Sequence, residues 1–433
     1  MNIKKDPREF LLNCFNIAIE SANPIKSLRN FLPSPPKGRV LVVGAGKAAA
    51  SMAKAVEIEW ASGVKLSGIV ITRYAHGLPL KNIKCIEAGH PVPDNAGEDA
   101  AREIYESVGA LGEDDLLLCL ISGGGSSLLS LPADGLENDD IKLVTKELLR
   151  CGAPITDINI VRKHISKIQG GKLALQSKAP VCALIISDVV GDNPSDIASG
   201  PCSADPSTFQ DAIDVLSRWQ VNVPPRIGKY LEKGKRREIE DNPKPGDTRL
   251  RHVSEAVIAT AKTSLNAVKQ YAEAQGISCI SMGDAITGEA KDVGEVIGGW
   301  AFSVASSDSS TDLKKPLLIL SGGECTVTVS GDGRGGRCAE FLLSVALKIS
   351  SLTDNSISIY GVAGDTDGID GVSPHAGVYF TPTSIQDSIS MGINPKKCLE
   401  NNDALGVFEP LKNVITTGPT LTNVNDFRGI LII

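Results

Sequence analysis

The sequence predicts an α/β fold, with a Rossmann-like, mainly parallel sheet domain followed by a smaller C-terminal α/β domain. Short, almost wholly apolar segments alternate with segments of helical length, which is the pattern of parallel strands covered by helices on both faces. Several apolar segments run directly into glycine-rich turns, as in RVLVVGAGK at 39–47 and LLLCLISGGG at 116–125. In sheets of this class, such turns lie at the carboxyl ends of strands, where ligands bind.

The individual elements follow from the same patterns. Strands are expected at 39–43, 68–72, 83–87, 116–121, 181–187, 256–259, 277–280, 316–320, 325–329, 357–362, 377–380 and 429–433. Helices are expected at 7–22, 47–61, 97–108, 139–150, 208–218, 260–275, 287–304 and 337–350.

Two polar stretches interrupt this alternation. Residues 232–252 are charged and contain Pro and Gly, which favours a surface loop or hinge, and the small polar run at 306–315 favours a linker. We therefore expect an N-terminal Rossmann-like domain over 1–250, or to about 305 on a wider boundary. Connecting helices and the linker would span 251–315, and the C-terminal domain would span 316–433.

Composition excludes several classes of protein. The chain has 433 residues, of which 42% are hydrophobic and 22% charged, which is ordinary for a globular protein. A net charge of −7 and 4% aromatic residues argue against nucleic-acid binding. We expect no membrane span, because the longest uncharged stretch, 116–133, is interrupted by three glycines. Ten scattered cysteines without a Cys-x-x-Cys motif favour a reducing, cytoplasmic location.

The first glycine-rich turn contains Gly44, Gly46 and Lys47. Its G-x-G-x-x-A pattern is formally a dinucleotide fingerprint, and Arg73 at the end of the next expected strand leaves NADP open. Lys47 fits better as a charge directed at a phosphoryl group or a carboxylate. A purely structural tight turn is the third interpretation.

The second turn, at 122–127, is expected to bind a phosphate or substrate anion through backbone N–H groups, and a close strand–helix junction is the alternative interpretation. No lysine follows at P-loop spacing, so it is not a Walker A motif. Arg162, Ser166 and Lys172 could also reach an anionic ligand, since 162 and 166 share a helix face. The candidate ligand contacts in this turn are Ser122, Gly123, Gly124, Gly125 and Ser126.

Two carboxylates follow the buried strand at 181–187, namely Asp188 and Asp192. At the carboxyl edge of a parallel sheet they could hold Mg²⁺, or Asp188 could take the proton of a hydroxyl group. A helix-capping role for an aspartate is the alternative.

The C-terminal part repeats the strand-to-turn pattern in Ser321-Gly322-Gly323-Glu324. A glycine-dense hairpin then carries Arg334 and Arg337, and GDTDGIDG at 364–371 contains Asp365. That last run lacks the closing glutamate of an EF-hand, so calcium is not expected. Together these segments favour metal–nucleotide handling, with Gly322, Gly323, Glu324, Arg334 and Asp365 as candidate ligand contacts.

As a set, these motifs resemble the glycerate 2-kinase family, whose C-terminal part is called the MOFRL domain. The resemblance runs in order from about residue 8 to the end of the chain. It rests on VVGAGKAA at 42–49, GHPVPDNAG at 89–97, LISGGGSSLL at 120–129, NIVRKHIS at 159–166, GGKLA at 170–174, SDVVGDNPSDIASGP at 187–201, LSGGECTV at 320–327, GRGGR at 333–337, GDTDGIDG at 364–371 and TGPTLTNVNDF at 417–427.

The resemblance implies ATP- and Mg²⁺-dependent phosphorylation of D-glycerate at its 2-hydroxyl, in an active-site cleft between the two domains. It implies Lys47, Asp188 and Arg337 as catalytic residues. Lys47 and Arg337 would neutralise the phosphoryl group and the carboxylate. Asp188 would orient the hydroxyl or hold Mg²⁺, and Asp192 would support the metal. Two departures stand out, because the family usually has Asn-Gln where this chain has Cys338-Ala339, and His375 is unusual at its position.

Two other functions remain open at this point. An NADP-dependent hydroxypyruvate reductase would use the G-x-G-x-x-A turn and Arg73, although the sequence offers no obvious histidine–carboxylate pair. A non-catalytic phosphosugar-binding module would bind without turnover. We expect small-molecule ligands, with neither nucleic acid nor membrane as a partner, and a homodimer is one assembly compatible with this interpretation.

Overall fold

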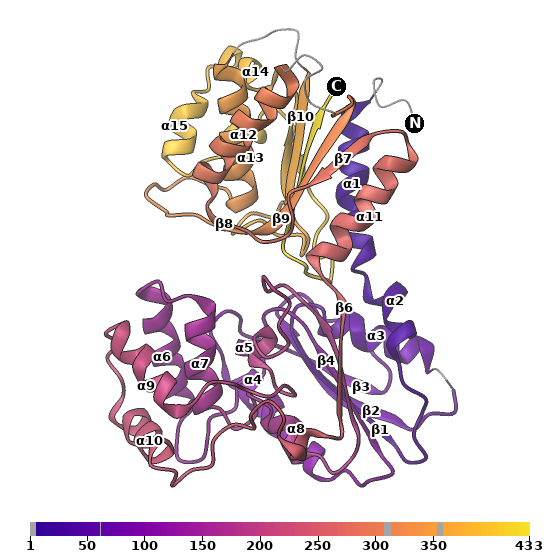
Figure 1. Cartoon of the computed structure of the whole chain (residues 1–433), viewed down its shortest axis with the longest axis vertical. Coiled ribbons are helices and arrows are strands. Elements are labelled where there is room, and N and C mark those ends of the chain that lie inside the picture. The colour runs from indigo at the N-terminus through magenta and orange to yellow at the C-terminus, as the bar shows by residue number, and fades with distance from the viewer. Residues whose placement is uncertain (1–5, 61, 307–312, 353–357) are drawn as a thin grey trace. The chain divides into compact units, whose positions relative to one another are not determined.

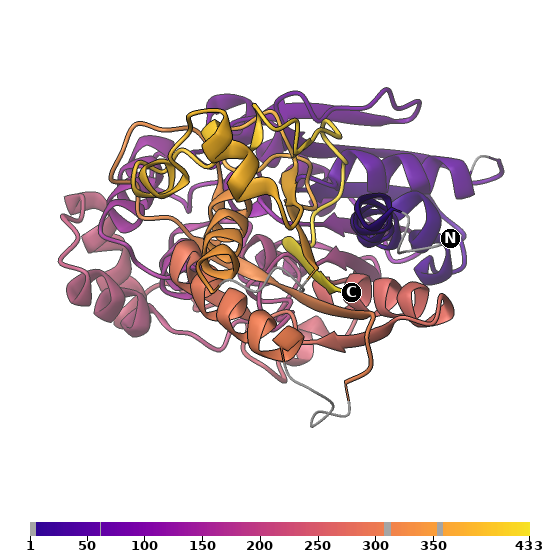
Figure 2. The same cartoon turned by 90° about the horizontal axis from the view of Figure 1, so that it is seen from above.

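The computed structural model describes residues 6–60, 62–306, 313–352 and 358–433. Its contacts divide the chain into two compact units (Figures 1 and 2). One unit is Pro24–Ile258, and the other joins the residues up to Asn23 with Ala259–Ile433. No helix among the described residues is long and apolar enough to cross a membrane.

The Pro24–Ile258 unit is built on a six-stranded sheet of order β3-β2-β1-β4-β5-β6. The pairs β1–β2, β2–β3, β1–β4 and β4–β5 are parallel. Strand β1 is followed by β2 on one side and β4 is followed by β5 on the other, so the connections after β1 and β4 run toward opposite edges of the sheet. In sheets of this class, ligands bind at this point. The strands are β1 (Val40–Ala45), β2 (Leu66–Arg73), β3 (Ile83–Ala88), β4 (Leu116–Ile121), β5 (Val181–Ile186) and β6 (Val253–Ala259).

Helices cover this sheet and form a side cluster. Helix α3 packs against β1, β2 and β4, whereas α4 packs against β2 and β3. Helices α6, α7, α9 and α10 share a hydrophobic core of their own (Figure 1). The helical segments are α2 (Pro24–Ser27), η1 (Leu28–Phe31), α3 (Ala49–Glu59), α4 (Asn95–Gly109), α5 (Gly125–Leu128), α6 (Asn138–Arg150), α7 (Ile155–Ile165), α8 (Lys172–Gln176), η2 (Ile197–Ser199), α9 (Phe209–Arg218), α10 (Pro225–Lys235) and η3 (Thr248–Leu250).

The second unit contains a mixed sheet of order β12-β11-β10-β13-β9-β7, with β8 also paired to β9. Strand β13 is antiparallel to both β10 and β9, whereas β7 and β8 run parallel to β9. The apolar C-terminal strand is therefore fully paired, as expected from the sequence. The strands are β7 (Ser278–Ser281), β8 (Ile286–Glu289), β9 (Leu317–Thr326), β10 (Ile359–Asp365), β11 (Gly377–Phe380), β12 (Val414–Ile415) and β13 (Asp426–Ile432).

Helices cover both faces of the mixed sheet (Figure 1). Helices α1 and α11 pack on one side, and α12 and α13 bury a separate core on the other. The helices are α1 (Pro7–Ser21), α11 (Ala261–Ala274), α12 (Ala290–Ser306), α13 (Arg337–Ser351), α14 (Ser384–Ser390), α15 (Pro395–Glu400) and α16 (Leu405–Phe408).

The structure changes the expected boundaries in two places. Helix α1 lies in the second unit, because Phe10, Phe15 and their neighbours pack with α11 and with Phe427 of β13. Much of 251–315, expected as a connection, forms β6 of the first sheet and α11 to α12 of the second unit. Most of the expected linker, 307–312, lies outside the described residues.

Two local expectations were wrong. Residues 321–324 are not a turn, because they continue β9, with Gly322 and Gly323 paired to Phe427 and Asp426 of β13. The charged segment expected as a loop from residue 232 begins inside α10, which buries Leu231 and Gly234 against its neighbours. In both cases partners distant in the sequence, rather than local composition, determine the conformation.

Candidate active site

The N–H groups of the loop after β1 donate hydrogen bonds to other parts of the protein. The N–H of Gly46 donates to Ile71, that of Lys47 to Gly123, and that of Ala48 to the Ser122 hydroxyl. A Cβ on Gly44 or Gly46 would overlap Leu120 or Ser122, respectively. These two glycines therefore let the β1 and β4 loops approach closely, and they leave Lys47 to contribute its side chain rather than its N–H group.

The loop after β4 has the free donors that the β1 loop lacks. The N–H groups of Gly123, Gly124 and Ser126 have no acceptor among the described residues. Gly124 has a φ of 80°, in the left-handed region that glycine adopts without strain. Buried N–H groups are normally paired, so neighbouring unpaired N–H groups at a bend can bind an anion. The expected anion-binding turn at 122–126 thus has suitable geometry.

Side chains from two other loops pack against this turn. A Cβ on residue 123 would overlap the carboxylate of Asp188. A glycine is therefore required at position 123 for Asp188 to reach the β4 loop. The Ser126 and Ser199 hydroxyls are 2.9 Å apart, and Ser199 is also 2.9 Å from the Asn159 side chain. The turn therefore has a carboxylate on one side and a hydrogen-bonded brace on the other.

Positive charge gathers beside the turn. Lys47, Arg73 and Arg162 each act on His90, and together with burial, which is the largest cause, they lower the pKa of His90 to about 4. Arg73 and Arg162 make no side-chain hydrogen bond or ion pair with a described residue. Burial lowers the pKa of Arg162 to about 10, because no carboxylate compensates its desolvation. An unpaired, largely buried guanidinium is costly unless a ligand anion pairs with it.

His90 is a site residue that sequence reasoning missed. It follows β3 at the same carboxyl edge of the sheet, and its Nδ1 lies 2.8 Å from the Ser127 hydroxyl. The partner of His90 is a serine, not the carboxylate that a histidine acid–base pair would have. His90 could have been found from its position directly after an expected parallel strand, since ligands bind at that edge of such sheets.

Asp188 and Asp192 are the candidates for Mg²⁺. The described residues contain no group of three or more His, Cys, Asp or Glu side chains arranged to hold a metal. Mg²⁺ is commonly held by only one or two carboxylates together with substrate phosphates. The donor set therefore fits a metal that arrives with a nucleotide, and it does not fit a metal held by the protein alone.

In the second unit, the expected residues Arg337, Glu324 and Asp365 come together. Arg337 at the start of α13 contacts Glu324 at 3.0 Å, Asp365 at 2.8 Å and Asp426 at 2.7 Å. Asp365 and Asp426 are buried, whereas the Glu324 side chain is half-exposed. Coulombic attraction to the carboxylates outweighs burial and raises the pKa of Arg337.

Other expected residues of the second unit have different partners. Arg334 is exposed and forms an ion pair of 2.6 Å with Glu409. Gly323 has a φ of 119° and lets Ile286 of β8 approach, and the N–H of Gly322 donates to Gly283. These glycines serve strand packing and do not form a phosphate-binding turn.

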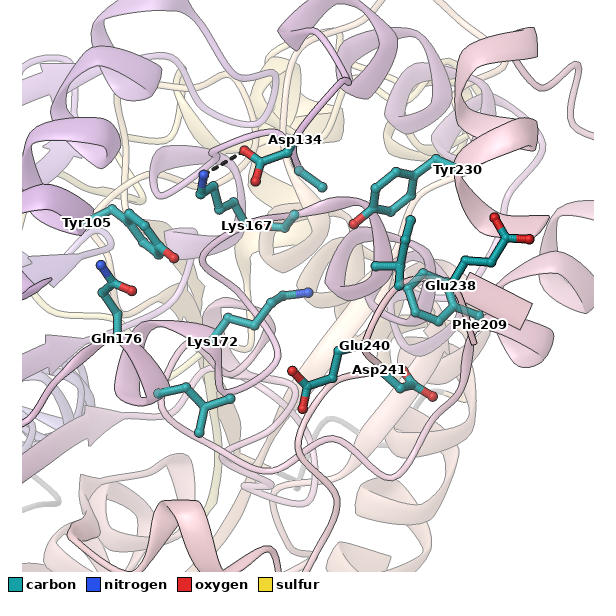
Figure 3. A pocket seen from close by; sticks show the side chains of 14 residues that line it. Tyr105, Asp134, Lys167, Lys172, Gln176, Phe209, Tyr230, Glu238, Glu240 and Asp241 are labelled. Carbon is teal, nitrogen blue, oxygen red and sulfur yellow. Dashed lines mark hydrogen bonds and ion pairs between the residues drawn. The ribbon is translucent and has the colours of Figure 1, made fainter. Parts of the chain in front are cut away.

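A cavity of about 460 Å³ lies elsewhere in the Pro24–Ile258 unit, between α8, α9 and α10 (Figure 3). Lys172, considered as an anion contact, lines it, but its Nζ donates to the Lys163 carbonyl and the Asn242 side chain, each at 2.6 Å. Lys167 pairs with Asp134 at 2.6 Å. Both lysines therefore have partners within the protein. Of the expected anion contacts Arg162, Ser166 and Lys172, Ser166 and Lys172 line this cavity and Arg162 does not.

Comparison with known proteins agrees with this architecture. A family model described as Domain of unknown function (DUF4147) matches residues 10–232, and the model of the MOFRL family matches residues 317–426. A protein of Pyrococcus horikoshii named glycerate 2-kinase is 38% identical, covering 98% of this chain and 97% of its own. A protein of Agrobacterium vitis, provisionally named a hydroxypyruvate reductase, is 43% identical, covering 98% of this chain and 94% of its own. The crystal structure of a glycerate kinase from Thermotoga maritima matches with a TM-score of 0.87 at 33% identity, covering 99% of this chain and 100% of its own.

Proposed function

The chain belongs to the glycerate 2-kinase family, whose C-terminal part is the MOFRL domain, and we propose that it transfers the γ-phosphoryl group of ATP to the 2-hydroxyl of D-glycerate. The products are 2-phosphoglycerate and ADP. The attacking oxygen of the 2-hydroxyl forms the new P–O bond, the bond from the γ-phosphorus to the bridging oxygen of ADP breaks, and the hydroxyl proton leaves.

The observation that carries this proposal is the excess of positive charge and free N–H donors at one edge of an acidic protein. The chain has a net charge of −7, yet Arg73 and Arg162, beside the turn at 122–126, have no carboxylate partner in the described part of the chain. Phosphoryl transfer needs positioning and neutralisation of anionic oxygens more than covalent chemistry. A site of this kind suits a substrate carboxylate together with phosphate groups.

Individual roles follow from the residue types. The N–H groups of Gly123, Gly124 and Ser126 bind anionic oxygens, and Arg162 pairs with a carboxylate or phosphate. Lys47 neutralises the charge on the transferring group. Asp188 accepts or orients the proton of the attacking hydroxyl, because it is the carboxylate that reaches the turn at Gly123.

Mg²⁺ belongs to this proposal as a companion of the nucleotide. When bound, it neutralises charge on the β- and γ-phosphate oxygens. Asp188 and Asp192 are the residues that would hold it, jointly with those phosphates.

Arg337 retains its proposed contact with the phosphoryl group through Nη1. The contacts of Nε and Nη2 with buried Asp426 and Asp365 fix the side chain. The Nη1 contact goes to Glu324, the most exposed of the three carboxylates. Glu324 is therefore the partner that a ligand anion would displace, rather than the buried aspartates.

The test is product analysis after incubating the protein with D-glycerate, ATP and Mg²⁺. Phosphorus NMR, or coupling through enolase alone, separates 2- from 3-phosphoglycerate. We expect 2-phosphoglycerate, formed only with Mg²⁺, and a loss of several powers of ten in rate for Lys47→Ala. Near-normal turnover by Lys47→Ala would remove that residue from the mechanism.

Some relatives are provisionally named hydroxypyruvate reductases, so the experiments also test reductase activity. A reductase would place a dinucleotide pyrophosphate on the β1 loop, but the N–H groups of Gly46, Lys47 and Ala48 already donate within the protein. Oxidation of NADPH by hydroxypyruvate would support the reductase. Thermal stabilisation by D-glycerate without turnover would support a binding module instead.

A further inference from the structure

His90 presents one nitrogen to the protein and leaves the other free. Its ring lies against the anion-binding turn, since a Cβ on Gly124 would be 3.0 Å from Cε1. Nδ1 is 2.8 Å from the Ser127 hydroxyl, whereas Nε2 has no hydrogen-bond partner among the described residues. The side chain is only partly buried.

The neighbouring serine determines which nitrogen carries the proton. The Ser127 hydroxyl has one proton, and it is 3.2 Å from the Gly124 carbonyl, which can only accept. When this proton is donated to Gly124, the serine oxygen must accept from His90. Nδ1 is then the protonated nitrogen, and Nε2 carries a lone pair.

The surrounding charges keep the ring neutral. The charged groups that act on it are Lys47, Arg73 and Arg162, all cationic, and with burial they disfavour a second proton. The Gly124 carbonyl offsets this only in part. At neutral pH, Nε2 therefore remains a hydrogen-bond acceptor.

Apart from the Asp188 carboxylate, the groups described so far beside this turn that could contact a ligand are donors. The free N–H groups of Gly123, Gly124 and Ser126 donate, as do the unpaired guanidinium groups of Arg73 and Arg162. Donors of this kind bind carboxylate and phosphate oxygens. A neutral Nε2 instead matches a hydroxyl group, which must donate its proton to be satisfied.

We propose that His90 is a specificity-determining residue, whose Nε2 accepts a hydrogen bond from the 3-hydroxyl of the substrate and so selects dihydroxy acids over monohydroxy acids. This inference rests on the proposed function. D-Glycerate has two hydroxyls, and Asp188 is already assigned to the attacking 2-hydroxyl. A site built to bind a hydroxyl strongly rejects the analogue that lacks it, because a polar group is left unpaired.

The experiment compares D-glycerate with D-lactate, which keeps the carboxylate and 2-hydroxyl and lacks the 3-hydroxyl. We measure kcat/KM for both with the full chain, ATP and Mg²⁺, in wild type, His90→Asn and His90→Gln. The Asn amide can replace the Nδ1–H donor toward Ser127, and the longer Gln can place a carbonyl oxygen near the position of Nε2. If D-lactate turnover is below detection, its inhibition constant against D-glycerate replaces kcat/KM.

We expect wild type to favour D-glycerate by about a hundredfold or more. His90→Asn should lower kcat/KM for D-glycerate about tenfold and leave D-lactate within about threefold, and His90→Gln should recover part of the preference. An equal loss on both substrates, or an unchanged preference, would overturn the inference. A wild-type protein that phosphorylates neither acid would overturn the proposed function itself, so the two failures are distinguishable.

Discussion

Arg162 and Lys163 are adjacent cations on α7, and the structure predicts opposite effects when each is replaced by methionine. Arg162 has no partner among the described residues, whereas Lys163 forms a fully buried ion pair of 2.8 Å with Asp205. Burial lowers the pKa of Arg162 to about 10, which corresponds to about 3 kcal/mol of uncompensated desolvation at 1.36 kcal/mol per pKa unit. Arg162→Met removes this penalty and keeps most of the packing volume.

We therefore expect Arg162→Met to raise the melting temperature of the ligand-free protein. A gain of 1 kcal/mol moves the transition of a unit of this size by about 2–4 °C, so a rise of about 2–6 °C is reasonable after lost packing is allowed for. The same variant should lose about a hundredfold in kcat/KM for D-glycerate, because a charge-assisted pair contributes about 1.5–3 kcal/mol. Calorimetry and steady-state kinetics on one preparation measure both effects.

Lys163→Met is the matched control, with the same replacement one residue along the same helix. It leaves the Asp205 carboxylate buried, although Ser207 and Asn242 still donate to it, so a cost of about 3 kcal/mol and a lower melting temperature are expected. If Arg162→Met destabilised the protein as Lys163→Met does, Arg162 would be a structural cation and the argument for a ligand anion would fail.

Three further predictions test other parts of the structure. Gly124→Ala should lower activity and cost about 1–2 kcal/mol, because its φ of 80° disfavours a Cβ and that atom would crowd the His90 ring; circular dichroism melts and kinetics measure this. Burial raises the pKa of Asp370 to about 7, so its protonated form should stabilise the protein at low pH, and this contribution should be lost as pH rises from about 4 through 7. Melts from pH 4 to 8 should therefore show a flatter profile for Asp370→Asn, and parallel profiles would contradict that burial effect. Chelation of Mg²⁺ should abolish turnover and leave the melting temperature of the ligand-free protein unchanged, since the described residues hold no protein-only metal cluster.

Local sequence predicted the first sheet and its ligand-binding edge well, because parallel strands are apolar on both faces and end in recognisable turns. The turn at 122–126 is an example, since its glycines are required by the left-handed φ of Gly124 and by the approach of Asp188 to Gly123. The similar-looking Gly322 and Gly323 could not be distinguished from the sequence. Their conformation depends on β13, about a hundred residues later, and on Ile286 of β8.

The boundary between units was also beyond local reasoning. Helix α1 has an ordinary amphipathic pattern, which shows that it buries one face and does not show against what. Its apolar face packs on α11, β10 and β13, all at least two hundred residues away in the sequence. The same limit applies to His90, whose Ser127 partner follows β4, a strand that is not a neighbour of β3 in the sheet.

The two clusters of predicted site residues differ in charge balance, and this difference separates their roles. In the Pro24–Ile258 unit, the described residues include no acidic partner for Arg73 or Arg162 and no acceptor for several N–H groups of the turn after β4, so this unit already favours an anion. In the second unit, Arg337 faces the three acids Glu324, Asp365 and Asp426. The three carboxylates hold the guanidinium group in position and neutralise its charge. An anion can therefore pair with Arg337 only by displacing half-exposed Glu324. Removing that competitor, as in Glu324→Gln, should therefore strengthen the binding of anionic ligands if Arg337 contacts the phosphoryl group, and should have no effect on binding if Arg337 only braces the start of α13.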